Sequence, residues 1–173
     1  GRPILQGRIH TIKAFEPNKI YIGSDQGLTL FDPSTQKYIT TSYNRNNSSS
    51  LSDDFVYDIL KDNEGGLWIT TYFGGINYSN PNSSNFTIRH CATESARGRI
   101  ISKFHEDKNG DIFIGTDDGG LFIYNPIKDK CHRYTIDKSN PNLNIHAIWS
   151  NDTYLWIGTY SKGLYRINHK TKY

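Results

Sequence analysis

The chain has 173 residues, of which 13% are aromatic and 21% are charged, and its formal net charge is +3. This small, scattered charge argues against a nucleic-acid-binding protein, which needs a stripe of Lys and Arg. No apolar run reaches the 18 residues of a membrane-spanning helix. The sequence starts with glycine, lacks methionine and has no signal peptide, so we interpret it as a segment of a longer protein.

The first predicted element is a β-hairpin. An aromatic-led β run is followed by a short polar stretch, a glycine and a second β run, a pattern typical of two strands joined by a tight loop. The same pattern occurs four times, in residues Asn18–Phe31, Gly65–Tyr78, Gly110–Tyr124 and Tyr154–Ile167.

The four copies are regularly spaced. Their aromatic anchor residues are separated by 47, 45 and 43 positions, and these anchors are Tyr21, Trp68, Phe113 and Trp156. A period near 45 residues without helical periodicity is typical of β-propeller blades with four strands each. We expect the anchors to lie in the core between blades, with Trp68 and Trp156 largely buried beside Ile59, Phe104 and Ile148.

Two further strands complete each predicted repeat. Strand a precedes the hairpin strands b and c, and strand d follows them. In the second copy, strands a, b and c are predicted at Val56–Lys61, Leu67–Thr71 and Gly75–Ser79. Predicted copies of strand d are Lys37–Tyr43, Phe86–His90 and Cys131–Ile136, whereas the last copy is barely begun at Thr171. The predicted fold is all-β, a partial seven-bladed β-propeller of four four-stranded blades spanning residues 8–43, 54–90, 99–136 and 143–173.

The two cysteines, Cys91 and Cys131, fall at the end of one d strand and the start of the next. Those strands are predicted at the rims of adjacent blades, farther apart than the roughly 5.5 Å Cα spacing of a disulfide. We therefore expect two free thiols.

The repeat resembles a known family. The string LWITTYFGGINYSNP, preceded by D-x-x-G and accompanied by WIGT in its sister copies, is similar to the two-component regulator propeller repeat, and this resemblance extends over residues 8–168. Thr70 departs from the pattern, because the other copies have glycine there. The resemblance implies the periplasmic sensor region of a hybrid two-component histidine kinase that recognises glycan-derived oligosaccharide and regulates transcription.

The b–c loops are the candidate ligand site, because in propellers these loops lie together on one face with the d–a loops. They differ between copies and offer aromatic faces beside a few polar groups, as carbohydrate recognition requires. Solvated loop tips without a ligand are the alternative interpretation. The candidate residues are Asp25, Tyr72, Phe73, Asp117, Asp118, Tyr160 and Lys162.

Other chemistry is poorly represented in the sequence. Adjacent acids such as Asp53 and Asp54 diverge too much to act as the two carboxyls of a glycosidase. The segment 107–111 suits a hairpin turn better than a calcium loop, and the histidines lack paired metal spacing. We therefore expect no enzyme activity, no metal and no cofactor.

The predicted function is ligand sensing by an extracytoplasmic segment. A protein-interaction scaffold and a propeller lyase or glycosidase are the alternatives. The expected partners are an oligosaccharide, and either further copies of the chain bound through its end blades or the rest of a parent propeller. A closed ring, with Pro3–Gln6 completing the last blade, is the competing arrangement. We expect no contact with nucleic acid or a membrane.

Overall fold

A computed structural model describes residues 3–82, 86–89, 91 and 100–171. Within these ranges the chain forms fifteen β-strands in antiparallel sheets, so the predicted all-β fold is confirmed. No helix in the described part is long and apolar enough to cross a membrane. The chain divides into two compact units. The first unit comprises Gly1–Lys61 and Gly65–Ile88, and the second comprises Asp62–Glu64 and Arg89–Tyr173.

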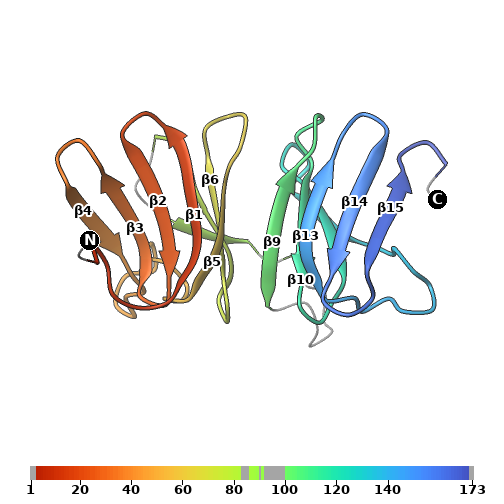
Figure 1. Cartoon of the computed structure of the whole chain (residues 1–173), viewed down its shortest axis with the longest axis horizontal. Helices are drawn as coiled ribbons and strands as arrows, with labels where there is room; N and C mark the ends of the chain where they lie inside the picture. The colour runs from red at the N-terminus through yellow and green to blue at the C-terminus, as the bar shows by residue number, and fades with distance from the viewer. Residues whose placement is uncertain (1–2, 83–85, 90, 92–99, 172–173) are drawn as a thin grey trace. The chain divides into compact units, whose positions relative to one another are not determined.

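The first unit contains two four-stranded sheets, each in simple up-and-down order (Figure 1). Sheet 1 consists of β1 (Ile9–Glu16), β2 (Lys19–Ser24), β3 (Gly27–Asp32) and β4 (Lys37–Thr41). Sheet 2 consists of β5 (Val56–Lys61), β6 (Leu67–Thr71), β7 (Gly75–Ser79) and β8 (Phe86–Arg89).

The second unit repeats this plan. Sheet 3 consists of β9 (Ile101–Glu106), β10 (Ile112–Thr116), β11 (Leu121–Asn125) and β12 (Lys130–Tyr134). Sheet 4 has three strands within the described residues, β13 (Ile145–Ser150), β14 (Tyr154–Thr159) and β15 (Leu164–Asn168). The fourth strand of the last repeat, which the sequence predicts to be barely begun at Thr171, coincides with a turn at that residue, and its remainder lies outside the described residues.

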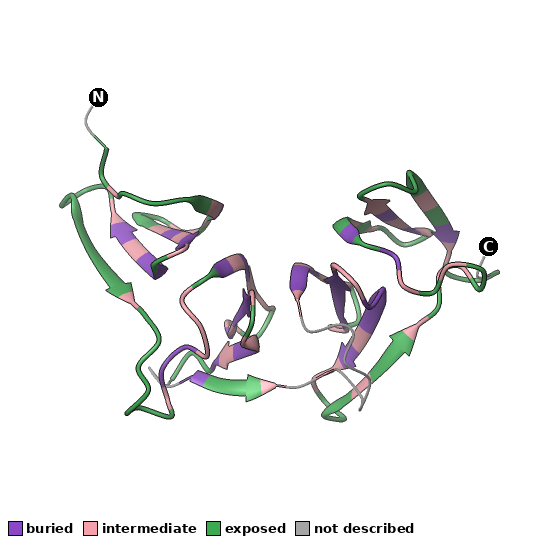
Figure 2. Ribbon diagram, turned by 90° about the horizontal axis from the view of Figure 1, so that it is seen from below, coloured by how far each residue is buried: buried purple, intermediate pink, exposed green. Residues whose placement is uncertain are grey.

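The predicted a, b and c strands agree closely with the structure, and β5, β6 and β7 have the predicted bounds. The d strands are shorter or shifted. Strand β4 ends at Thr41, because Tyr43 instead forms an isolated parallel bridge with Leu51. Strand β12 starts at Lys130 and ends at Tyr134, and β8 ends at Arg89, beyond which His90 lies outside the described residues. The d strands are also the most exposed, whereas buried residues concentrate on the inner strands (Figure 2).

The core of the first unit lies between sheets 1 and 2. Tyr21 and Leu28 of sheet 1 pack with Val56, Ile59 and Ile69 of sheet 2. Alternating side chains in β2 and β6 place every second residue on this interface, as a pleated strand requires. The aromatic anchor of sheet 1 therefore faces the sheet that follows it in the chain.

The second unit has the same core arrangement. Phe113 of sheet 3 packs with Ile145, Leu155 and Ile157 of sheet 4. The anchor of sheet 3 thus also faces the following sheet, and the predicted role of the anchors as core residues holds for Tyr21 and Phe113.

The two tryptophan anchors differ in burial. Trp68 is only 2% exposed, with the Tyr78 ring 4.6 Å away, as predicted. Ile59 and Phe104 are also buried, and Ile148 is half-buried. Ile59 pairs with Ile69 and Trp68 pairs with Leu60, so the predicted packing of Ile59 beside Trp68 is wrong, because the two residues lie on opposite faces of sheet 2. The prediction of a largely buried Trp156 is wrong, because its ring lies on the face of sheet 4 opposite to the core and is half-buried there.

The prediction of free cysteines is also wrong. Cys91 and Cys131 form a disulfide, with their Cα atoms 5.3 Å apart. Cys91 lies beyond the end of β8, so it is not held in sheet 2 and belongs to the second unit. An ion pair within the second unit lies two residues before each cysteine, where Arg89 Nη1 is 3.5 Å from Asp129 Oδ2. The prediction failed because it took the end of one d strand and the start of the next to be farther apart than a disulfide spans.

Candidate functional site

The b–c loops share one construction. The last residue of each b strand is Ser or Thr. Its hydroxyl donates a hydrogen bond to the backbone carbonyl of the glycine at the end of the b–c loop, where strand c begins. The donor and acceptor pairs are Ser24–Gly27, Thr71–Gly75, Thr116–Gly120 and Thr159–Gly163. These four glycines have φ between +77° and +115°, a backbone conformation that favours glycine. Fixed hydroxyl and glycine positions let the residues between them vary without disturbing the strands.

A β-bulge occurs at the same position of every a strand, next to these loops. Each a–b ladder skips one residue, so that Ile9 pairs with Ser24 and Thr11 with Gly23, which leaves His10 without a ladder partner. A bulge redirects a side chain relative to the regular strand. The four skipped residues are His10, Tyr57, Ser102 and His146.

In the first unit, the bulged residues form the start of an aromatic series. The His10 ring stacks on Tyr57 with centroids 4.3 Å apart and an interplanar angle of 13°. Tyr57 lies 5.4 Å from Tyr72, and Tyr72 meets Phe73 edge-on at 4.5 Å. Phe73, at the end of this series, is 74% exposed. We call these four residues the aromatic ladder; it joins strands β1 and β5 to the b–c loop of sheet 2.

Polar groups hold the surroundings of the aromatic ladder in place. Asp25 accepts a hydrogen bond from the Arg8 backbone N–H at 3.2 Å, which fixes the chain two residues before His10. Asp53 accepts the Phe73 backbone N–H at 2.9 Å. His10 Nε2 is buried without a hydrogen-bond partner in the described structure. The ladder therefore combines an exposed aromatic face with one unsatisfied polar atom.

The adjacent acids Asp53 and Asp54 both accept hydrogen bonds from backbone N–H groups of loop residues. Asp53 binds Phe73 N–H, and Asp54 accepts the Tyr43 N–H at 2.6 Å. A glycosidase needs two carboxyls directed at one bond, whereas these two act as anchors for different segments.

In the second unit, the corresponding loops bring together a smaller and more polar group. His146 Nε2 lies 3.4 Å from Asp117 Oδ1, and the His146 and Tyr160 rings are 5.6 Å apart. Tyr160 is 76% exposed, and its backbone N–H donates to the Asn144 carbonyl. Lys162 is exposed in the same loop as Tyr160, and Asp118 is half-buried beside Asp117.

The structure therefore joins Tyr72 with Phe73 in one unit, and Asp117 with Tyr160 in the other. Sequence analysis missed His10, Tyr57 and His146, which connect these loop residues to the a strands. They precede the second apolar residue of each a strand by two positions. The regular alternation of side chains between the two faces of a strand does not predict their direction, because the bulge interrupts that alternation. The recurrence of aromatic or imidazole side chains at this one position of three repeats was the available signal.

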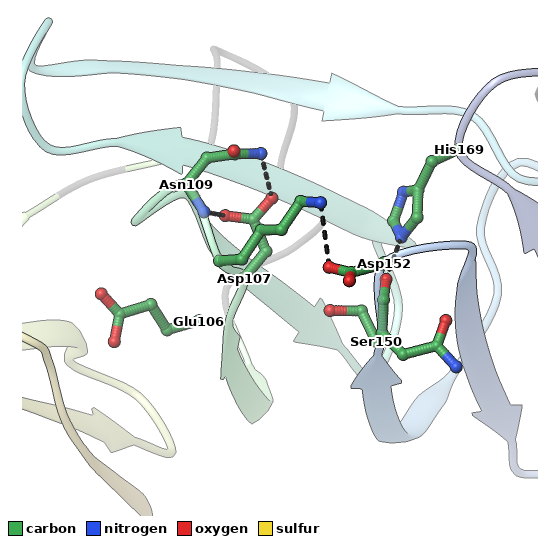
Figure 3. Close-up of a pocket in the computed structure, with 8 residues that line it drawn as sticks. Glu106, Asp107, Asn109, Ser150, Asp152 and His169 are labelled. Atoms are coloured by element: carbon green, nitrogen blue, oxygen red, sulfur yellow. Dashed lines mark hydrogen bonds and ion pairs between the residues drawn. The ribbon is translucent and has the colours of Figure 1, made fainter.

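A polar pocket of about 410 Å³ lies in the second unit, at the ends of the strands opposite to the b–c loops (Figure 3). The turn after β9 and the turn after β13 line it, together with His169. Its polar groups largely satisfy one another: Lys108 Nζ lies 2.9 Å from Asp152, and Asp107 accepts the backbone N–H groups of Asn109 and Asp111. Segment 107–111 is thus the hairpin turn that the sequence predicts.

Burial shifts two titrating groups near this pocket. It raises the pKa of the Glu106 carboxyl and lowers the pKa of the His105 imidazole. His105 Nε2 accepts the Ser150 backbone N–H at 3.0 Å, which requires a neutral ring. Within the described residues, no group of three or more His, Cys, Asp or Glu side chains is placed to hold a metal ion.

The strands, their order and the repeated loop construction define a protein built from β-propeller blades. Residues 50–73 match the model of a family described as two component regulator propeller. The recognition of this repeat from the sequence is thereby confirmed, and the matched segment contains Tyr57, Tyr72 and Phe73 of the aromatic ladder. No curated protein matches the chain significantly.

Solved structures share the fold at low sequence identity. The extracellular domain of the hybrid two component system BT3049 from B. thetaiotaomicron is 21% identical over 94% of this chain, with a TM-score of 0.57. The extracellular domain of the hybrid two component system BT4673 from the same organism is 19% identical over 96% of this chain, with a TM-score of 0.62. The match covers 27% and 29% of those chains, so this chain spans under a third of their length. The computationally designed Ika4 protein is 13% identical, with a TM-score of 0.65 over 97% of this chain and 98% of its own.

Proposed function

We propose that this chain is the ligand-recognition segment of an extracytoplasmic sensor, and that its ligand is an oligosaccharide bound across the aromatic ladder. The ladder carries the proposal: four rings run from β1 to an exposed loop tip, and Phe73 presents most of its surface to solvent. Sugar rings have apolar C–H faces that pack on such rings, and a few fixed polar groups set their orientation.

The disulfide supports an extracytoplasmic location. Disulfides persist in oxidising compartments such as the bacterial periplasm and are rare in the cytosol. Cys91 and Cys131 are paired, and no free cysteine occurs in this chain. We place the segment in the periplasm, outside the inner membrane.

Signalling is the second part of the proposal. The matched repeat family and the two extracellular sensor domains with this fold support a parent protein that is a hybrid two-component histidine kinase. In that protein, ligand binding outside the membrane would change the activity of a cytoplasmic kinase and so alter transcription. The segment itself has a binding role and no catalytic role.

Calorimetric titration of the purified chain with a panel of neutral and acidic oligosaccharides tests the binding proposal. We expect at least one member to bind, and Phe73→Ala to weaken its affinity by about tenfold or more through loss of stacking area. Tyr38→Ala is the matched control, because Tyr38 is also exposed, at 51%, but lies on β4 away from the b–c loops.

Two results would contradict the proposal: no binding by any oligosaccharide to the folded chain, or equal affinity for the Phe73 variant and the wild type. Binding of a protein partner at the same loops, without any sugar, would favour the interaction scaffold instead. For the signalling part, ligand-dependent phosphorylation of the full-length protein in cells should be lost with Phe73→Ala and kept with Tyr38→Ala.

A further inference from the structure

A buried polar cluster lies beneath the b–c loop of sheet 2. The Asn77 side chain on β7 is 0% exposed, and its amide holds Ser52 twice: Oδ1 accepts the Ser52 backbone N–H at 2.8 Å, and Nδ2 donates to the Ser52 hydroxyl at 2.8 Å. The Ser52 hydroxyl also lies 3.1 Å from that of Thr71, which is 0% exposed as well. Strand β7 therefore fixes segment 52–55, which leads into β5.

Segment 52–55 in turn holds the b–c loop 72–74. The Phe55 carbonyl accepts the Tyr72 N–H at 3.0 Å, and the Asp53 carboxylate accepts the Phe73 N–H at 2.9 Å. The third loop residue packs directly on the segment, because a Cβ atom added to Gly74 would lie 2.6 Å from the Cβ of Ser52. Each residue of the loop is thus held from the segment that Asn77 fixes.

One part of this arrangement is common to the four repeats, and another part varies. In every repeat, the first residue of the b–c loop donates its N–H to a carbonyl just before strand a; the donors and acceptors are Asp25–Arg8, Tyr72–Phe55, Asp117–Ile100 and Tyr160–Asn144.

The position of Asn77 is the part that varies. The residues at the same ladder position, opposite an isoleucine of strand b, are Thr29 in sheet 1, Phe122 in sheet 3 and Tyr165 in sheet 4. A blade can therefore form with an aromatic residue at this position, and the amide of Asn77 goes beyond what the sheet itself requires.

We infer that Asn77 and Asp53 are positioning residues for the proposed ligand site, which hold loop 72–74 in its binding arrangement before a ligand arrives. This inference rests on the proposed function. The Phe73 ring at the loop tip is 74% exposed, and a mobile tip would lose conformational freedom on binding, which weakens affinity. A buried polar cluster whose groups satisfy one another specifies a single arrangement instead.

Hydrogen exchange of the Phe73 amide, followed by nuclear magnetic resonance, measures this positioning without any ligand. We expect Asp53→Ala to speed the exchange by about tenfold or more, because the N–H loses its acceptor. Asn77→Thr, which introduces the residue type of sheet 1, should speed it by about threefold or more through the loosened Ser52. Far-ultraviolet circular dichroism checks that each variant is folded.

Two further variants serve as matched controls. Asp53→Asn should keep the wild-type exchange rate, because an amide oxygen still accepts the Phe73 N–H. Asp54→Ala should keep it too, since Asp54 is half-buried like Asp53 but accepts the N–H of Tyr43.

Calorimetric titration with the tightest-binding oligosaccharide of the panel measures the effect on the ligand site. We expect Asp53→Ala and Asn77→Thr to weaken affinity by about threefold or more, because binding must then order the loop. Both controls should bind as the wild type does.

The possible failures can be told apart. Faster Phe73 exchange with unchanged sugar affinity would overturn the inference, because the two residues would then support only the fold. Wild-type exchange and affinity in Asp53→Ala would overturn it as well. Absence of binding by the wild-type chain would contradict the proposed function, and with it the ligand part of this inference. The exchange rates identify that case, because they are measured without ligand.

Discussion

The residue that each a–b ladder skips next to the b–c loops decides which a-strand side chains reach those loops. His10 and Tyr57 are redirected by bulges at the same ladder position, and as a result their rings stack although they come from different sheets. Their positions depend on backbone pairing, so apolar spacing alone could not predict them. Tyr72 and Phe73 were predictable, because loop residues between a fixed Thr and a fixed Gly are free to vary.

The two tryptophan anchors should contribute unequally to stability. Trp68 is 2% exposed, whereas Trp156 lies half-buried on the face of sheet 4 opposite to the core. Trp68→Ala should reduce the free energy of unfolding by about 3–5 kcal/mol, as expected for a buried aromatic side chain, and Trp156→Ala should cause a clearly smaller loss. Urea titration of the two variants measures the difference. Equal losses would contradict the unequal burial of the two side chains.

Glu16 should make stability depend on pH in the acidic range. Its carboxylate pairs with Lys19 and Lys61, and these ammonium groups lower its pKa from 4.5 to about 2. The folded state therefore binds the Glu16 proton less tightly than the unfolded chain. The contribution of Glu16 is complete above about pH 4.5 and is lost as the pH falls toward about 2.

The matched measurement compares thermal unfolding of the wild type and Glu16→Gln between these pH values. We expect the wild type to be more stable near neutral pH and the difference to shrink on acidification. A difference that is constant with pH would show that the ion pairs do not form in solution.

At the scale of the elements, strand positions were predictable wherever the repeat supplied several copies of one pattern. Strands β5, β6 and β7 match their predicted bounds, because apolar alternation and turn residues agree there. The d strands were less predictable, since they are exposed and carry little apolar pattern. Tyr43 shows the cause: its segment leaves sheet 1 to form a bridge with Leu51.

The disulfide joins the link after β8 to strand β12, across 40 positions of sequence. Replacing both cysteines, Cys91→Ser with Cys131→Ser, should lower the free energy of unfolding by about 3–4 kcal/mol, because the cross-link restricts the unfolded chain. Denaturant titration measures the loss, and the oxidised native chain should show no reactive thiol with a thiol reagent. Two reactive thiols in unreduced protein would restore the sequence-based expectation of free cysteines.

At the scale of the whole molecule, the repeat period predicted the fold class, because blade-sized β repeats have few other solutions. The proposed ligand site was only partly predictable. Its loops follow from the repeat, but the aromatic ladder needs packing between β1 and β5, which are 47 residues apart at His10 and Tyr57.

The central claim is that the bulged residues and the b–c loops form the ligand site. Nuclear magnetic resonance titration of the chain, with the tightest-binding oligosaccharide from the calorimetric panel, tests it most directly. The account predicts that chemical-shift changes concentrate on His10, Tyr57, Tyr72 and Phe73. Changes confined to the opposite ends of the strands, around Asp107 and Asp152, would contradict it.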